Sequence, residues 1–175
     1  MTALGRTPTN TNFLLPAGFQ IIVKKLPTTT FFTQDINIPG FSLPNVVQAN
    51  PFLGIPLTGD HIDFEALSMS FKVDEDLRNY LEIYNWICGE GYPDDYEQYK
   101  TLAEKTKFSQ EGLYSDITIL ITTNIMNANL QFTFRDAFPV SLSGFRLTTT
   151  DNNLTEIMTT ATFKYTKYDI ITIPK

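Results

Sequence analysis

Few residues of this chain could do chemistry, and their types exclude most kinds of catalytic site. The 175 residues include one cysteine, Cys88, and one histidine, His61. A thiol and an imidazole could form a nucleophilic dyad, but Cys88 falls among apolar residues at helical spacing, where a buried structural thiol is far more common. Single copies also exclude a multi-histidine metal site, a cysteine cluster and an internal disulfide. We therefore expect neither catalytic residues nor a cofactor.

Carboxylates offer one further chemical possibility, in an acidic loop. Asp94 and Asp95 next to Glu97 could contact a hard cation, but the glycine and terminal glutamate of a calcium loop are missing. A solvated loop is the more common explanation, so we expect no metal site. The same loop, Tyr92–Tyr99, supports an alternative function as a hydrolase or sugar-binding β-sandwich. No glycine-rich phosphate loop, nucleophile elbow or metalloprotease helix occurs.

The charge of the chain is unevenly distributed. The formal net charge is −6, with a pI near 4.7, which argues against a protein that grips nucleic acid through its phosphates. Between Gly59 and Glu97 there are eleven acidic residues, and Lys72 and Arg78 are the only bases. Such a block is usually a solvated face and otherwise an interaction surface.

Composition predicts one mainly β domain. Hydrophobic residues make up 42% of the chain, and many threonines alternate with apolar residues, a pattern that favours strands. No apolar run approaches the roughly 18–20 residues of a membrane span, so we expect no membrane anchor. We expect an extended arm over residues 1–16 and a single domain over 17–175, with an insertion at about 89–114.

Alternation of apolar and polar residues predicts six or seven antiparallel strands. The fold class is therefore α+β and mainly β, an antiparallel sandwich or small barrel with one helix. A bulge is expected near Ser143-Gly144, and the last strand is expected to break near Thr166–Asp169. The expected strands are Phe19–Lys25, Thr29–Asn37, Phe64–Val73, residues 117–122, Leu130–Arg135, Val140–Leu147 and Leu154–Ile171.

One helix is expected directly after the third of these strands, over Glu75–Cys88. Asp74 is a good N-cap and Gly89 a reasonable C-cap. The expected buried stripe consists of Leu77, Tyr80, Leu81, Tyr84, Ile87 and Cys88. Trp86 falls off this stripe; it either folds over the edge of the core or is exposed for a partner. A further helical turn is expected near Glu97–Lys107.

The segment Phe41–Gly59 combines prolines and glycines with many apolar side chains. Such a segment is either tucked onto the core or covered by a partner.

The order of these elements resembles the tail tube proteins of contractile-tailed, T4-like bacteriophages, whose fold is shared with type VI secretion tube proteins. The chain resembles these proteins in the order and spacing of its elements, from Phe19 to Ile171. The residues that carry it are Phe19-Gln-Ile-Ile-Val, Ile38-Pro-Gly-Phe-Ser-Leu-Pro, Thr58-Gly-Asp, the strand from Phe64 to Asp74, the helix ending at Asn85-Trp86, Phe138-Pro-Val-Ser-Leu-Ser-Gly, and the strand after Asp151-Asn-Asn.

The resemblance implies a structural virion protein that has no enzymatic activity. Six copies would form a ring, and stacked rings would make the inner tube of a contractile tail, through which phage DNA passes on ejection without specific binding. The implied partners are the sheath protein, the baseplate and the tail terminator. The protein would be found in the virion tail, and in the host cytoplasm before assembly.

The resemblance also suggests which residues meet which partner. The apolar segment would be the long loop that reaches the neighbouring ring, through Phe52, Leu53 and Ile55. The helix would face the sheath through Glu75, Asp76, Glu82 and Trp86. The lumen would be lined by Ser68, Ser70, Thr160 and Thr162, with Lys72 and Lys164 near strand ends, paired with acids.

Two rival functions use the same fold. A baseplate tube initiator or a tail terminator would cap the tube in few copies, whereas the tube protein polymerises. A bacterial type VI-like secretion tube is the other alternative.

Overall fold

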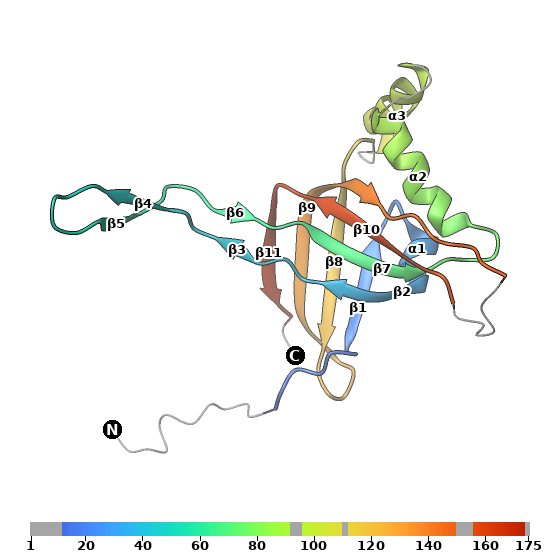
Figure 1. Ribbon diagram of the computed structural model, residues 1–175. Coiled ribbons are helices and arrows are strands. Elements are labelled where there is room, and N and C mark those ends of the chain that lie inside the picture. Colours follow the sequence, from blue (N-terminus) through green and yellow to red (C-terminus); the bar gives the residue numbers. More distant parts are fainter. Residues whose placement is uncertain (1–11, 92–95, 110–111, 150–155, 174–175) are drawn as a thin grey trace.

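Seven antiparallel strands form one bent, open sheet, in a computed structural model that describes residues 12–91, 96–109, 112–149 and 156–173 (Figure 1). The strand order is β1-β8-β9-β10-β7-β2, with β11 also paired to β9. This architecture confirms the mainly β class. The strands are β1 (Phe19–Val23), β2 (Thr33–Asn37), β7 (Leu67–Lys72), β8 (Ser115–Thr122), β9 (Ala128–Leu142), β10 (Met158–Lys164) and β11 (Lys167–Thr172).

Strand β9 belongs to two half-sheets that face each other across the core. Its first part pairs with β8 on one side and β11 on the other, whereas Phe138–Leu142 pairs with β10. Asp136 lies between these parts with a φ of 53°, and such a local departure from extended geometry bends a strand. The first half-sheet is therefore β1-β8-β9-β11, and the second is β9-β10-β7-β2.

The core lies between the two half-sheets and is closed on one side by a helix. Alternation places Leu67, Met69 and Phe71 of β7 inward, as predicted. These three side chains are almost completely buried, as expected for the apolar face of a strand. The other large core residues are Ile21, Val23, Leu26, Ile83, Trp86, Ile117, Ile119, Phe134, Phe163 and Tyr165.

The structure contains three helices within the described residues, where one was expected. They are α1 (Pro27–Phe32), α2 (Arg78–Gly91) and α3 (Tyr96–Ser109). The expectation of a strand over Thr29–Asn37 is wrong in its first half, which is α1. The expected bounds of the main helix are also wrong, because Leu77 has a φ of 57° and α2 begins only after it. A helical turn was expected in the insertion, and α3 is a full helix there.

Two expected strand boundaries also differ. The pair Leu130–Arg135 and Val140–Leu147 is a single strand, β9, that runs through Pro139. Proline is tolerated there because β10 is the only described neighbour of this part of β9, which makes it an edge. The irregularity in register falls opposite Thr162 and Phe163 and not at Ser143-Gly144. The long last strand is interrupted between Lys164 and Lys167, close to the expected break near Thr166–Asp169, so that β10 and β11 join different half-sheets.

A narrow two-stranded arm projects from one end of the second half-sheet (Figure 1). We call residues 41–64 the hairpin arm; it comprises β3 (Phe41–Ser42), β4 (Asn45–Gln48), β5 (Ile55–Thr58) and β6 (Asp63–Phe64). Strand β3 pairs with β6 at its base, and β4 pairs with β5 towards its tip. Gly59 is required between the two pairs, because a Cβ there would lie 2.2 Å from the carbonyl oxygen of Pro44.

Candidate assembly surfaces

The hairpin arm exposes apolar side chains that no part of the described chain covers. Phe52 at its tip is 97% exposed, and Leu53 and Ile55 are also open to solvent. The residues of Asn45–Thr58 include no charged side chain. Monomeric proteins rarely present a contiguous apolar surface of this kind, so the arm is a candidate contact surface.

The base of the arm is anchored by aromatic rings. Phe41 and Phe64 contact each other and both contact Tyr168, with ring centroids 5.6–6.5 Å apart. Tyr165 packs against Phe64 and lies 4.9 Å from Phe134, and burial raises its pKa to about 12. These contacts attach the arm to the core and leave its tip free.

The four residues predicted to line a lumen lie together on one face of the second half-sheet. Thr160 is directly opposite Ser70, and Thr162 is directly opposite Ser68, on the neighbouring strands β10 and β7. The hydroxyls of Ser70 and Thr160 are hydrogen bonded at 2.9 Å. On the next strands outward, Asp35 and Asn37 of β2 lie opposite Ser70 and Ser68, and Ser141 of β9 lies opposite Thr162. The side chains of this face, which we call the hydroxyl face, are therefore mainly small and polar.

The two lysines that share this face are the last residues of their strands, as predicted. Lys72 ends β7 and forms an ion pair with Glu156, just before β10. Lys164 ends β10 and is exposed, and no ion pair of its ammonium group is found among the described residues. The predicted acid partner is thus present for Lys72 within one chain.

Two of the four residues expected on a sheath-facing helix surface have other roles. Glu75 and Asp76 are exposed just before α2, and Asp76 lies 3.1 Å from Arg78. Glu82 instead accepts hydrogen bonds from the backbone N–H groups of Thr28 and Thr29. Its carboxylate therefore caps the N-terminus of α1, where negative charge is favourable.

Of the two alternatives for Trp86, the structure has the one in which it folds over the edge of the core, since its side chain is 3% exposed. The sheath-facing role that the resemblance suggested for it is therefore wrong. The buried stripe of α2 consists of Asn79, Ile83, Trp86 and Gly89. Leu77, Leu81 and Tyr84, which were expected to point inward, are exposed. Gly89 is not a C-cap: α2 continues to Gly91, and Gly89 allows close packing on Leu102 of α3.

The indole of Trp86 holds several groups at the edge of the core. It donates a hydrogen bond from Nε1 to the carbonyl oxygen of Leu113 at 2.9 Å, and the ammonium group of Lys25 lies 4.1 Å from its ring. Glu90 is half-buried nearby, and desolvation raises the pKa of its carboxyl group. This group of residues joins α2 to the segment before β8.

Asn79 organises the other end of α2, although no sequence signal singled it out. Its side-chain amide donates to the carbonyl oxygen of Lys72 at 2.6 Å. Its side-chain oxygen accepts from the backbone N–H groups of Asp74 and Tyr80. A buried asparagine with three partners fixes how the end of β7 turns into α2.

The residues considered for chemistry are not brought together. His61 lies on the exposed arm beside Asp60, 2.6 Å from its carboxylate, whereas Cys88 is half-buried on α2. Asp94 and Asp95 lie outside the described residues. Within the described part of the chain, no group of three or more His, Cys, Asp or Glu residues could hold a metal ion.

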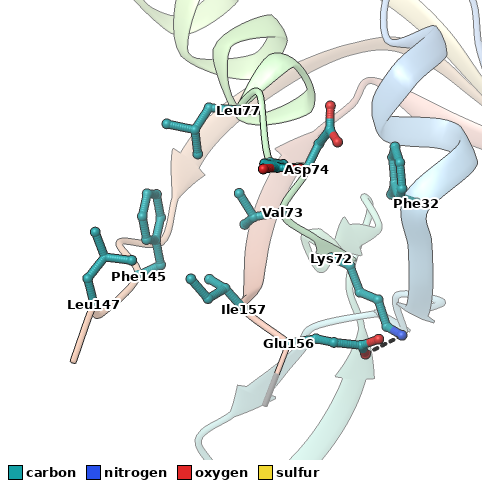
Figure 2. A pocket seen from close by; sticks show the side chains of 10 residues that line it. Phe32, Lys72, Val73, Asp74, Leu77, Phe145, Leu147, Glu156 and Ile157 are labelled. Atoms are coloured by element: carbon teal, nitrogen blue, oxygen red, sulfur yellow. Dashed lines mark ion pairs between the residues drawn. The ribbon is translucent and has the colours of Figure 1, made fainter. Parts of the chain in front are cut away.

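A cavity of about 570 Å³ opens at the end of β7 opposite the hairpin arm. We call it the end groove; Figure 2 shows apolar side chains gathered around it, with the Lys72–Glu156 ion pair at one side. Phe145 is held there by an edge-to-face contact with Tyr80 at 5.2 Å. The lining residues are Phe32, Lys72, Val73, Asp74, Glu75, Leu77, Phe145, Leu147, Glu156 and Ile157.

Comparison with known proteins identifies the family of the chain. The family model of the phage tail tube protein matches residues 22–171, nearly the whole described domain. The chain belongs to the phage tail tube protein family. The family is structural, and the resemblance stated from the sequence is thereby confirmed. No curated protein sequence matches the chain.

Solved structures share its fold at low sequence identity. The anti-feeding prophage tube-terminating cap superposes with a TM-score of 0.65 and 14% identity, covering 99% of this chain and 100% of that one. The sheath–tube complex of an extracellular contractile injection system gives 0.60 and 12%, covering 91% and 92%. The sheath/tube terminator of that system gives 0.61 and 15%, covering 93% and 99%.

The hairpin arm, the hydroxyl face and the end groove are the candidate contact surfaces of this chain. No helix within the described residues combines the length and apolar character that crossing a membrane requires.

Proposed function

We propose that six copies of this chain close into a ring, and that stacked rings form the inner tube of a contractile phage tail. The observation that carries the proposal is a sheet whose two edges have no partner among the described strands, combined with an apolar arm that no described residue covers. Open edges and exposed apolar surface are hazards for a monomer and are consumed when copies associate.

Ring closure would use the two edges of the second half-sheet. One edge is β2, and the other is the part of β9 over Phe138–Leu142, which pairs only with β10 among the described strands. If β2 of one copy pairs with β9 of the next, four strands per copy join into one continuous barrel. The anti-feeding prophage baseplate, a similar fold with a TM-score of 0.57 and 11% identity, is described as 6-fold symmetrised.

Stacking would use the hairpin arm. Phe52, Leu53 and Ile55 would be buried against the neighbouring ring, in accordance with the inter-ring role proposed for them from the sequence. Burial of such side chains contributes about 1.5–3 kcal/mol each. Many identical contacts around a ring would make stacking cooperative.

The hydroxyl face would line the lumen of this barrel and let phage DNA slide during ejection. Hydroxyl groups hydrate a wall without gripping phosphate, and the net charge of −6 makes the chain repel DNA. The partners of the assembled tube would be the sheath around it, the baseplate at one end and the terminator at the other. The chain would lie in the virion tail and, before assembly, in the host cytoplasm.

A tube terminator is the second candidate function. The observation that favours it is the superposition on the tube-terminating cap over 99% of this chain and 100% of the other. A terminator would form single rings, because one face of its ring must not bind a further ring.

Electron microscopy of the purified chain, together with its mass in solution, separates the two functions. A tube protein forms long tubes with a hollow axis, and a terminator forms only rings. For the chain with Phe52→Ser and Leu53→Ser, we expect folded subunits or single rings that do not elongate. Unfolding of this variant, measured by circular dichroism, would show instead that the arm belongs to the core.

A further inference from the structure

The end groove lies at one end of strand β7, and the hairpin arm extends from the other end of the same strand. Strand β7 begins at Leu67, next to the base of the arm, and ends at Lys72, which lines the groove. Figure 1 shows the arm pointing away from the end of the sheet where α1 and the start of α2 lie. If a second copy were displaced along this direction, its arm would point towards the groove of the next copy.

The chemistry of the two surfaces matches. Leu77, Phe145 and Leu147 give the groove an apolar part, and Asp74 and Glu75 also line it. These carboxylates disfavour an acidic occupant, whereas Asn45–Thr58 carries no charge at all. A volume of about 570 Å³ lies in the range of about 300–1,000 Å³ that holds several apolar groups of a ligand.

The backbone at Leu77 provides a second, independent observation. Its φ of 57° is a conformation that a leucine seldom adopts, and the side chain so placed is 37% exposed at the groove. Strain of this kind is retained where the surrounding structure or a binding role requires it. A glycine would adopt the same backbone at less cost but would leave the groove without this side chain.

We propose that the end groove receives the hairpin tip of a second copy in the adjacent ring, with Phe52 and Leu53 seated on Leu77, Phe145 and Leu147. This inference rests on the proposed function and names the receiving site for the inter-ring contact. The contact is head-to-tail: its two sides are different surfaces of one chain, so it repeats without limit along the tube.

Disulfide trapping in assembled tubes tests the contact. With Cys88→Ser as background, Phe52→Cys is combined with Leu147→Cys; the side chain of Leu147 is 75% exposed. Oxidation should give a ladder of covalent products that extends beyond six copies, because the links run along the tube. The matched control combines Phe52→Cys with Ile125→Cys, since Ile125 is 76% exposed on the β8–β9 turn, and it should give no ladder.

The outcomes separate the two proposals. If tubes form but do not cross-link, the groove is not the receiving site, and the proposed function is unaffected. A ladder that stops at six copies overturns it as well, because the contact would then lie within a ring. A wild-type chain that never forms tubes overturns the proposed function, and this inference with it.

Variants that need no engineered cysteine extend the test if the double-cysteine chain does not assemble. Leu147→Ser and Leu77→Gly should raise the protein concentration needed for tube assembly at least tenfold, while the melting temperature of the subunit is unchanged or, for Leu77→Gly, higher. Ile125→Ser should leave assembly unchanged. Normal assembly of Leu147→Ser and Leu77→Gly would overturn the proposal.

Discussion

Asn79 is a buried polar residue that stabilises the fold through its hydrogen bonds. Its side chain is buried and is hydrogen bonded to three backbone groups, at Lys72, Asp74 and Tyr80. In addition, the backbone carbonyl oxygen of Asn79 accepts a hydrogen bond from the hydroxyl of Thr29 at 3.0 Å. One residue thereby connects β7, α1 and α2.

We expect Asn79→Ala to lower the free energy of unfolding of the subunit by about 2–3 kcal/mol, because backbone groups in the interior lose their partners. Urea unfolding of the unassembled subunit measures this change. Asn45→Ala, on the exposed arm, serves as the control and should change stability by less than about 0.5 kcal/mol. Equal stability of the two variants would show that water replaces the Asn79 side chain.

The residue scale also shows where sequence reasoning succeeds. Alternation alone places Met69 and Phe71 inward and Ser68 and Ser70 on the opposite face, because a strand has only two faces. A helix has no such restriction. The phase of α2 depends on the unusual backbone of Leu77, and this moves Trp86 into the core and Leu81 out of it.

At the scale of elements, α1 illustrates a structure that its own sequence does not predict. Three consecutive threonines, Thr28–Thr30, favour a strand. The helix forms because Pro27 stands in its first turn and Glu82, more than fifty residues away, caps its N-terminus. A cap supplied by another helix leaves no local signal. The apolar residues of the hairpin arm, in contrast, indicated a segment that is either tucked onto the core or covered by a partner, and the structure leaves Phe52, Leu53 and Ile55 exposed in the single chain.

The exposed acids before α2 are the part of the proposed sheath contact that the structure leaves available. Glu75→Gln with Asp76→Asn should weaken binding of assembled tubes to the sheath protein. The residual binding should also depend less on salt, because screening shortens from about 10 Å at 0.1 M to about 3 Å at 1 M. Co-sedimentation at several salt concentrations measures both effects.

A matched control removes two carboxylates elsewhere. Asp60→Asn with Asp63→Asn changes exposed residues on the hairpin arm and should leave sheath binding intact. Wild-type binding that does not respond to salt would show that the acids before α2 only keep the chain soluble.

For the whole molecule, the hydroxyl face leads to a prediction about transport. Ser70→Lys or Thr162→Lys should permit tube assembly but slow DNA release in an ejection assay. Each lysine–phosphate contact adds a salt-dependent hold on DNA, so the delay should shrink as salt is added. Ile22→Lys adds the same charge to an exposed position of β1 on the other half-sheet and should not slow release. Unchanged ejection with Ser70→Lys or Thr162→Lys would show that the other face lines the lumen.

The bent strand β9 has a mechanical consequence for such a tube. Its first part is hydrogen bonded to β8 and β11, and its last part to β10. If copies assemble as proposed, shear between the inner and outer layers of the tube wall would load a continuous covalent backbone as well as the packed side chains between the layers. In the proposed tube, force that a contracting sheath applied to the outside would be carried into the barrel along this strand, and the two layers would advance as one body.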